Sequence, residues 1–350
     1  MNKKIFKNLY SYPGTILFCI FFVILFRDFL YDYRLQLEKF FPYYDYQSQI
    51  IYYLTGDKKF DIESPMNLRF LGLFVQFIIY KVIPCIELNY LNSNSYPYQN
   101  YICATFSSAL MNYLSLCGIL STTYVYCKRK LSFSYGESFL TVLLSYIFIN
   151  HVESFTLDRI SIFYFLIVLY FLDNKKLSIL LIIFSCLVNE KIIFILGGAF
   201  AIRFIIEKKN TFKSYFWASG LSAVLAVSIF YLYSVVLENG YFQSNIDNGL
   251  YDTFFSDGLN RILSMFTGKS GLSNAALPLI LSIIPYLLNL NLRIKYTLYS
   301  KYDYLIPLSM LAFTAGGGME QTGRYVMYTM PIWLPLLSKQ IIYFLKKSNN

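Results

Sequence analysis

Charged residues are scarce in this sequence. Only 14% of its 350 residues are Asp, Glu, Lys or Arg, whereas 56% are hydrophobic and 20% are aromatic. The mean hydropathy is +0.47. Because soluble globular domains carry about 25% charged residues, this composition excludes an ordinary soluble domain and is typical of a polytopic membrane protein.

Histidine and closely spaced cysteine pairs are also lacking. His151 is the only histidine, and none of the six cysteines belongs to a C-x-x-C pair. We therefore expect no zinc site, because such a site needs several Cys, His or carboxylate ligands. The cysteines lie in or at the edges of apolar runs, so we expect them to be small packing residues.

Acidic residues are fewer than basic residues. The sequence has 20 acidic and 30 basic residues, a formal net charge of +10. The basic residues gather at the N-terminus and in alternate loops, at 128–130, 175–176, 203–213, 293–301 and 346–347. The positive-inside rule predicts this distribution, with both termini in the cytoplasm and no nucleic-acid partner. Richness in Lys, Asn, Tyr and Ile favours a bacterial source, so we expect the bacterial inner membrane.

Long apolar runs dominate the rest of the chain. They predict an all-α fold, a polytopic membrane helix bundle of about 10 spans. We expect a single transmembrane domain over residues 1–350, with outward loops at 28–68 and 238–275. The runs are 13–30, 101–127, 138–150, 160–172, 177–188, 192–206, 215–237, 277–292, 304–317 and 325–345. The residues Asn189 to Lys191 separate two of these runs, because they would be costly in hydrocarbon.

One further apolar run, Arg69–Ile86, does not fit this count of spans. Between the first outward loop and cytoplasmic Lys128 the chain must cross the membrane an odd number of times, yet it offers two apolar runs. We expect Arg69–Ile86 to be re-entrant, interfacial or buried against the bundle. A partial crossing by Asp45–Leu54 is the alternative.

Two candidate site residues belong to the first outward loop and its end. Asp45, in the segment PYYDYQSQIIYYL, begins a stretch with helical spacing. Its carboxylate is either a catalytic group or an ordinary helix N-cap. Arg69 stands at the start of the next apolar run. Its guanidinium either binds phosphate through paired hydrogen bonds or extends to the membrane interface.

Three further candidates lie at the predicted outer ends of later spans. Glu190 interrupts an apolar stretch, and adjacent Lys191 cannot face it on one helix, so we expect a partner elsewhere. Asp158 and Arg159 precede a span, where they are either part of a site or a cap and an anchor. A charge at the centre of a membrane helix costs about 2.5–3.5 kcal/mol, so such residues tend to mark sites, although structural ion pairs are the competing explanation.

The segment AGGGMEQTGRYVMYTMPIWLPLL carries the last two candidates, Glu320 and Arg324. They are four residues apart and would be neighbours on a helix. The three glycines Gly316–Gly318 allow the backbone to approach a ligand closely. The alternative is a polar hairpin with a local ion pair.

Taken together, the segments YYDYQSQIIYYLTG, LRFLG, LVNEKIIF and EQTGRYVMYTMPIWLPL resemble those of the GT-C superfamily of polytopic membrane glycosyltransferases. They cover about a fifth of the chain. The resemblance implies transfer of a sugar from a polyprenyl-phosphate donor to a glycan or glycolipid acceptor on the outer face of the membrane. Many relatives have paired acidic residues in the first loop, whereas Asp45 is followed by Tyr46. This difference favours Asp45 as a lone base. It also argues against a metal held by paired carboxylates, so we expect no metal ligands among the residues of the chain. A divalent metal that acts as a cofactor of the reaction stays open.

The resemblance also implies roles for the candidates. Asp45 would act as the catalytic base, and Arg69 and Arg324 would bind the donor phosphate. Supporting roles would fall to the remaining candidates, which are Glu190, Glu320, Asp158 and Arg159. The main alternative is an O-antigen or capsular polysaccharide polymerase, and a transporter or flippase is a further one.

Overall fold

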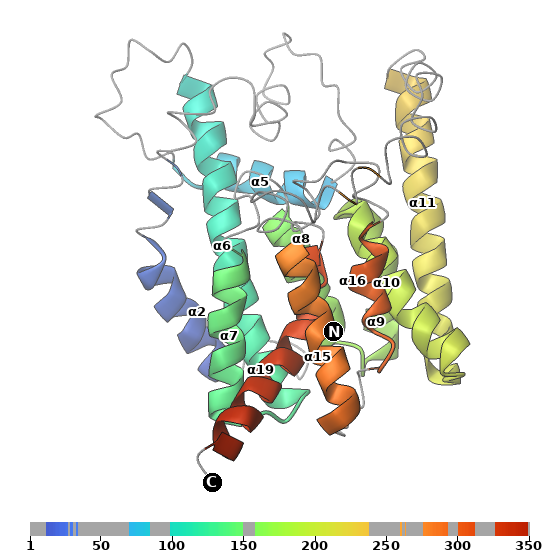
Figure 1. Ribbon diagram of the computed structural model, residues 1–350. Helices are drawn as coiled ribbons and strands as arrows, with labels where there is room; N and C mark the ends of the chain where they lie inside the picture. Colours follow the sequence, from blue (N-terminus) through green and yellow to red (C-terminus); the bar gives the residue numbers. More distant parts are fainter. Residues whose placement is uncertain are drawn as a thin grey trace. The chain divides into compact units, whose positions relative to one another are not determined.

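The computed structural model of the chain describes residues 12–26, 29–30, 33, 70–84, 99–149, 158–237, 260, 263, 276–292, 300–311 and 326–348 (Figure 1). Every regular element in these residues is a helix, and none of them is a β-strand. The prediction of an all-α fold is confirmed.

The helices coincide with the apolar runs of the sequence. They are α2 (Tyr12–Ile24), α5 (Phe70–Val82), α6 (Gln99–Arg129), α7 (Tyr135–Ile149), α8 (Asp158–Tyr170), α9 (Lys175–Phe184), α10 (Glu190–Ala201), α11 (Lys213–Leu237), α15 (Leu277–Leu292), α16 (Leu305–Ser309) and α19 (Met330–Ser348). The predicted break between two runs is present, because α9 ends at Phe184 and α10 begins at Glu190. A 3₁₀ turn, Ser185–Leu187, lies between them, and a π-helical turn, Ile202–Ile206, follows α10.

Among the described residues, one helix is long and apolar enough to cross a membrane. It covers Asn210–Ile229, with a mean hydropathy of 1.2. The shorter apolar helices are Pro13–Ile24, Leu71–Val82, Tyr135–Ile149 and Leu277–Leu288. About 10 spans therefore remain a prediction.

The chain divides into two compact units. Unit 1 comprises Met1–Thr122, Glu153–Tyr164 and Leu187–Asn189, and unit 2 comprises Thr123–Val152, Phe165–Cys186 and Glu190–Asn350. This division does not test the prediction of a single transmembrane domain.

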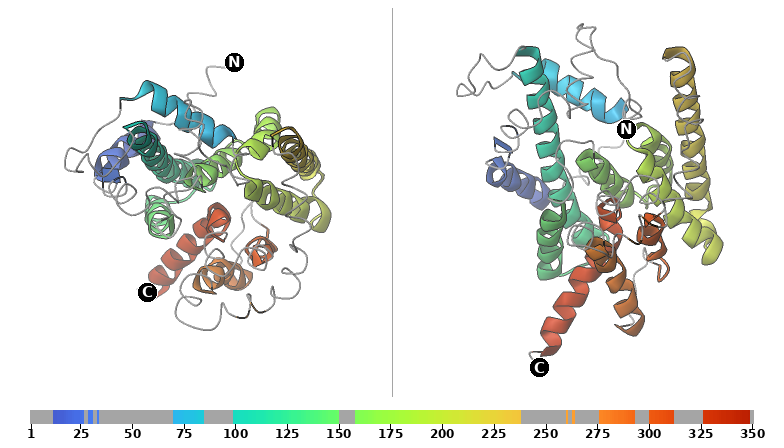
Figure 2. Two further views of the ribbon diagram at one scale, coloured as in Figure 1. Left: turned by 90° about the horizontal axis from the view of Figure 1, so that it is seen from above. Right: turned by 45° about the horizontal axis from the view of Figure 1, so that its top comes forward.

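In unit 1, α5 lies across α6 instead of beside it (Figures 1 and 2). Figure 2 shows α5 along its length in the view that looks down α6. With 13 residues, α5 is about 20 Å long. Leu73 and Ile79 of α5 pack against Met111 of α6 and Ile160 of α8. Two side chains of α5 therefore pack against other helices, and whether the 69–86 run is re-entrant, interfacial or buried against the bundle stays a prediction.

Helix α2 also packs on α6 in unit 1. The rings of Phe22 and Phe29 lie 5.2 and 5.3 Å from the Tyr113 ring, measured between centroids. Tyr33 is fully buried and meets Phe106 at 5.5 Å. Aromatic side chains therefore supply much of this contact.

The two ends of α6 differ chemically. Cys103, near its first residue, is disulfide-bonded, so the expectation that every cysteine is a plain packing residue is wrong at this position. Lys128 and Arg129 occupy its last turn. With 31 residues the helix is about 46 Å long, more than the hydrocarbon thickness of a bilayer.

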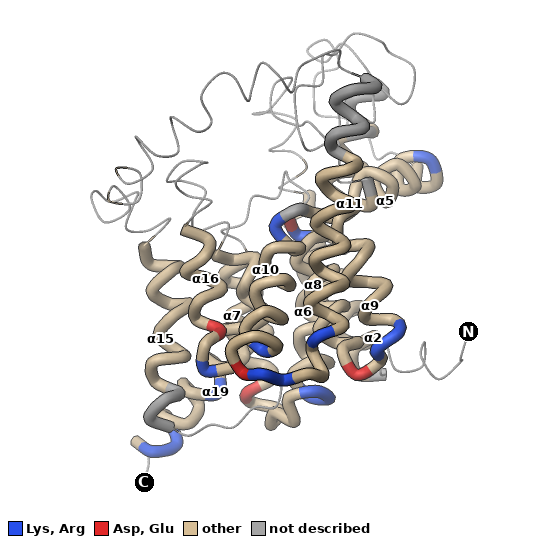
Figure 3. The backbone as a smooth tube through the Cα atoms, turned by 90° about the vertical axis from the view of Figure 1, so that its right-hand side faces the viewer, with Lys and Arg blue, Asp and Glu red and all other residues tan. Residues whose placement is uncertain are grey.

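In unit 2, α19 packs against α7 and α15, and α11 packs against α9 and α10. Figure 3 shows Lys and Arg at one end of α9 and of α11, and α19 carries Lys346 and Lys347 in its last turn and Lys339 in its middle. We call this the basic end of unit 2. Its Lys and Arg residues are Lys128, Arg129, Lys130, Lys175, Lys176, Arg203, Lys208, Lys209, Lys213, Lys301, Lys339, Lys346 and Lys347.

Contacts between turns that are distant in sequence hold the basic end together. Lys130 forms an ion pair with Asp173, which joins the end of α6 to the turn before α9. The Tyr215 hydroxyl donates a 2.6 Å hydrogen bond to the Leu172 carbonyl, which joins the start of α11 to the same turn. The Nζ of Lys339 lies 5.4 Å from the Phe133 ring centroid. Basic loops that are separated in sequence therefore meet at one end of this unit.

Candidate functional site

Most of the predicted site residues lie outside the described part of the chain. These are Asp45, Arg69, Glu320 and Arg324. Glu190 is the first residue of α10, where only its backbone is described. The predicted convergence of Asp45, Arg69 and Arg324 in one pocket therefore stays a prediction.

Asp158 and Arg159, the two remaining candidates, are the first residues of α8 in unit 1. Asp158 is fully buried, and Arg159 is 6% exposed. The helix dipole favours the Asp158 carboxylate at this N-terminus. The two charges are adjacent in sequence, so they lack the spacing of three or four residues that is typical of an ion pair along a helix. A helix cap and a membrane anchor need not be buried, whereas both of these charged side chains are.

Packing places this first turn of α8 against two other helices of unit 1. Ile160 shares a cluster with Leu73 of α5 and Met111 of α6. In addition, the Asn189 side-chain amide donates a 3.1 Å hydrogen bond to the Ser161 hydroxyl. The charged turn is thus held on one side by apolar packing and on another by a buried polar contact.

Unit 1 also contains many other buried polar side chains. Thr105, Ser108, Asn112 and Ser115 recur at helical spacing along one side of α6, in the half that begins near Cys103. We call the whole set the polar interior of unit 1. It consists of Gln76, Thr105, Ser107, Ser108, Asn112, Ser115, Asp158, Arg159, Ser161 and Asn189, each at most 6% exposed.

Most of the polar interior was not predicted from the sequence. Single polar residues within apolar runs, such as Gln76 and Asn112, were the available signal, since they are costly unless they face other helices or a ligand. Lys191 was also missed as a candidate. It lies in unit 2, is 7% exposed, and its Nζ is 5.3 Å from the Tyr328 ring centroid.

A second buried pair of charges lies in unit 2. The Arg203 guanidinium donates two 2.9 Å hydrogen bonds to the carboxylate of Asp303 and a 2.8 Å bond to the Ala199 carbonyl. It also lies 5.8 Å from the centroid of the Phe212 ring. Burial raises the pKa of Asp303 above its ordinary value, and the charge of Arg203 opposes that rise. Both oxygens of the Asp303 carboxylate thus accept a hydrogen bond from Arg203.

Near this pair, Glu207 forms a separate ion pair with Lys209. The Nζ of Lys209 lies 2.6 Å from a Glu207 carboxylate oxygen. Burial raises the pKa of Glu207, but hydrogen bonds from Lys209 and Ser300 lower it more, and the result is a pKa below the ordinary value. Glu207 therefore stays ionised at neutral pH.

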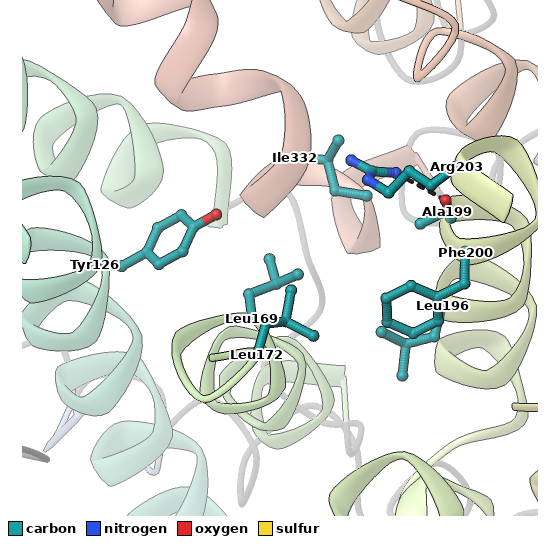
Figure 4. A pocket seen from close by; sticks show the side chains of 8 residues that line it. All are labelled: Tyr126, Leu169, Leu172, Leu196, Ala199, Phe200, Arg203 and Ile332. Atoms are coloured by element: carbon teal, nitrogen blue, oxygen red, sulfur yellow. Dashed lines mark hydrogen bonds between the residues drawn. The ribbon is translucent and has the colours of Figure 1, made fainter. Parts of the chain in front are cut away.

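Arg203 also borders a small cavity in unit 2 (Figure 4). The lining is apolar apart from Arg203 and the Tyr126 hydroxyl, and it is completed by Leu169, Leu172, Leu196, Ala199, Phe200 and Ile332. The volume is about 20 Å³. A single water needs about 10–15 Å³. The cavity has room for a water and none for a sugar or a lipid headgroup.

Within the described residues, no group of three or more His, Cys, Asp or Glu side chains is placed to hold a metal ion. Comparison of the chain with protein-family models, with curated proteins and with solved structures found no match.

Proposed function

We propose that this chain is a membrane glycosyltransferase, a polytopic helix bundle of about 10 spans in the bacterial inner membrane. It would move a sugar from a polyprenyl-phosphate donor to a glycan or glycolipid acceptor at the outer face. The observation that carries the proposal is the polar interior of unit 1, in which two charged side chains, Asp158 and Arg159, are buried, as are several amides and hydroxyls of the same unit. Membrane proteins bury such groups mainly where they bind or transfer polar substrates.

The two ends of α6 support the proposed orientation. Structural disulfides persist in oxidising compartments, which favours the outer side for the end that carries Cys103. Lys128 and Arg129 at the opposite end favour the cytoplasm. The polar side of α6 and Met111, which meets Ile160 of α8, belong to the half that begins near Cys103. The buried charges therefore lie toward the proposed outer side.

The transverse helix α5 supports the same assignment. Its Leu73 and Ile79 face unit 1, whereas Phe74, Ile78 and Val82 are exposed at spacings of four residues. An apolar stripe of this kind on a helix that lies across its neighbours suits the interfacial plane of a membrane. In the sequence, Arg69, the proposed phosphate ligand, comes directly before α5.

The proposed chemistry needs one base and several cations. Asp45 removes the proton from an acceptor hydroxyl, whose oxygen attacks the anomeric carbon of the donor sugar. The bond between that carbon and the phosphate oxygen breaks, and the lipid phosphate leaves with the electron pair. Arg69 and Arg324 stabilise the charge that develops on the phosphate. Arg159 adds a positive charge from the polar interior.

The test is sugar transfer in membranes that contain the full chain and a panel of radiolabelled polyprenyl-phosphate hexoses. We expect Asp45→Asn to lower the transfer rate by at least about a hundredfold, because a general base contributes about 10²- to 10⁴-fold. Asp57→Asn, in the same predicted loop, is the matched control and should keep most of the rate.

Retention of transfer by Asp45→Asn would overturn the assignment of the base, and so would an equal loss in Asp57→Asn. The absence of transfer from every donor would overturn the enzyme class. Formation of long polysaccharide ladders instead of a single addition would favour the polymerase alternative.

A further inference from the structure

The basic end of unit 2 holds nearly all of the charge on the described residues of this unit. Its thirteen Lys and Arg side chains face only four carboxylates, those of Glu137, Asp173, Glu207 and Asp303. Each of the four is engaged locally. Asp173 binds Lys130, Glu207 binds Lys209, Asp303 binds Arg203, and Glu137 accepts hydrogen bonds from Ser134. Counted over the described residues of unit 2, the end therefore carries many more basic than acidic side chains.

Large exposed aromatic side chains accompany these cations. Tyr135 is 74% exposed, and the Nζ of Lys128 lies 3.8 Å from its ring centroid. Trp217 is 62% exposed and stands one helical turn after Lys213. At the end of α19, the exposed side chains of Tyr343 and Phe344 precede those of Lys346 and Lys347. Aromatic rings beside ammonium groups are typical of side chains at the headgroup level of a membrane.

An exposed apolar helix face leads away from this charged end. On α11, Leu221, Val224 and Val227 follow Trp217 at helical spacing, and each is between 48% and 69% exposed. Only 22% of the apolar window of this helix is buried. A partner that covers both the cations and this face needs a negative head and an apolar tail. Nucleic acid and acidic soluble peptides lack the second part.

We propose that the basic end of unit 2 is a binding surface for anionic phospholipid headgroups, with the acyl chains against the exposed face of α11. The inference rests on the membrane location within the proposed function, and it is independent of sugar transfer. Each lysine near an anionic surface contributes about 1 kcal/mol, a preference of about fivefold. Several lysines on one end therefore select anionic over zwitterionic lipid.

The experiment measures lipid selectivity of the full chain in mixed vesicles of phosphatidylcholine and phosphatidylglycerol. Spin-labelled versions of both lipids report their relative association with the protein. We expect phosphatidylglycerol to be preferred by at least about fivefold at low salt. The preference should fall sharply at about 1 M salt, where the screening length is about 3 Å.

The decisive variant replaces four exposed lysines, those at positions 175, 176, 346 and 347, by Gln. It should lower the preference by at least about fivefold. The control replaces the same four lysines by Arg, which keeps their positive charge. It should not change the preference. The double variant Lys346→Gln/Lys347→Gln, confined to the exposed end of α19, replaces the fourfold variant if that protein does not fold.

Equal association of the two lipids with the wild-type protein would overturn the inference, as would an unchanged preference in the lysine variants. Loss of sugar transfer with retained lipid selectivity would count against the proposed enzyme alone. Retained sugar transfer without lipid selectivity would count only against the proposed lipid-binding surface.

Discussion

Two arginines of the described chain are buried, and the molecule holds them in different ways. Arg203 in unit 2 meets Asp303, one hundred residues later in the sequence, through paired 2.9 Å hydrogen bonds. Arg159 in unit 1 follows Asp158 directly, at the start of α8. Their exposed fractions are almost equal, at 7% and 6%.

The difference lies in how each charge can be balanced. A bidentate arginine–carboxylate pair satisfies both groups at once, so the unit 2 pair needs no ligand and serves as a structural link. Asp158 and Arg159 are consecutive residues in the first turn of α8, both are buried in unit 1, and each has an interaction partner there or elsewhere in the chain. The first arrangement is typical of stability. The second is the arrangement that we assign to the proposed site.

The largest expected effect is on the unit 2 pair. Arg203→Met should lower the free energy of unfolding by about 3–5 kcal/mol, because it leaves the Asp303 carboxylate buried without its cation. Unfolding in mixed micelles, followed by loss of helical circular dichroism, measures the change.

The double variant Arg203→Met/Asp303→Leu sharpens this result. Replacement of both charges by apolar groups should restore most of the lost stability, since a buried pair costs about as much in desolvation as it returns. If the double variant were as unstable as Arg203→Met, the two side chains would stabilise the protein by more than neutralising each other's charge.

The second largest expected effect is on the rate of sugar transfer after substitution of Arg159. Arg159→Met should lower the rate of sugar transfer by about a hundredfold, the usual loss when one preorganised donor to a developing charge is removed. Arg159→Lys keeps the charge without the planar fork, so it should fall between Arg159→Met and the wild type.

Exposed Arg129 supplies the matched control, and Arg129→Gln should leave the rate nearly unchanged. If Arg159→Met unfolds the protein to the same degree that it slows transfer, then Arg159 is a structural residue like Arg203. The comparison between the two arginines would then fail.

The smallest effect tests how α8 is seated on α6 in unit 1. A Cβ at Gly118 would lie 2.9 Å from two carbons of the Phe163 ring, whereas a Cβ at Gly198 would meet nothing within 4 Å. Both glycines are helical, so alanine gains about 1 kcal/mol of helix propensity at each. Overpacking costs about 1–3 kcal/mol at Gly118 only.

We therefore expect Gly118→Ala to be less stable than the wild type by about 1 kcal/mol and Gly198→Ala to be slightly more stable. Thermal melting of the two variants side by side measures this. Equal stability of both would mean that the α6–α8 contact yields easily and does not position Arg159.

Much of the local structure could be predicted from the sequence. The run 277–292 has the same bounds as α15, and the polar residues near Asn189 end one helix and precede the next as expected. Such features depend on hydropathy and on side chains within a few residues of each other, which a pattern search detects. The 69–86 run was recognised as unusual for the same reason.

Long-range pairing could not be predicted in this way. Arg203 was assigned to a cytoplasmic loop, whereas it lies buried in a π-helical turn, and Asp303 had no assigned role. The disulfide of Cys103 was missed because its apolar neighbours suggested packing alone. Of the predicted site, the structure describes the side chains of Asp158 and Arg159 only, so the roles of Asp45, Arg69 and Arg324 stay predictions.

The sequence by itself determined the all-helical architecture, the positions of the helices and the gathering of positive charge in alternate loops. Each of these follows from local hydropathy, helix propensity and charge. Only the tertiary structure decided which charges are buried and which of them meet. That outcome depends on how helices pack, and residues one hundred positions apart become neighbours only when their helices do.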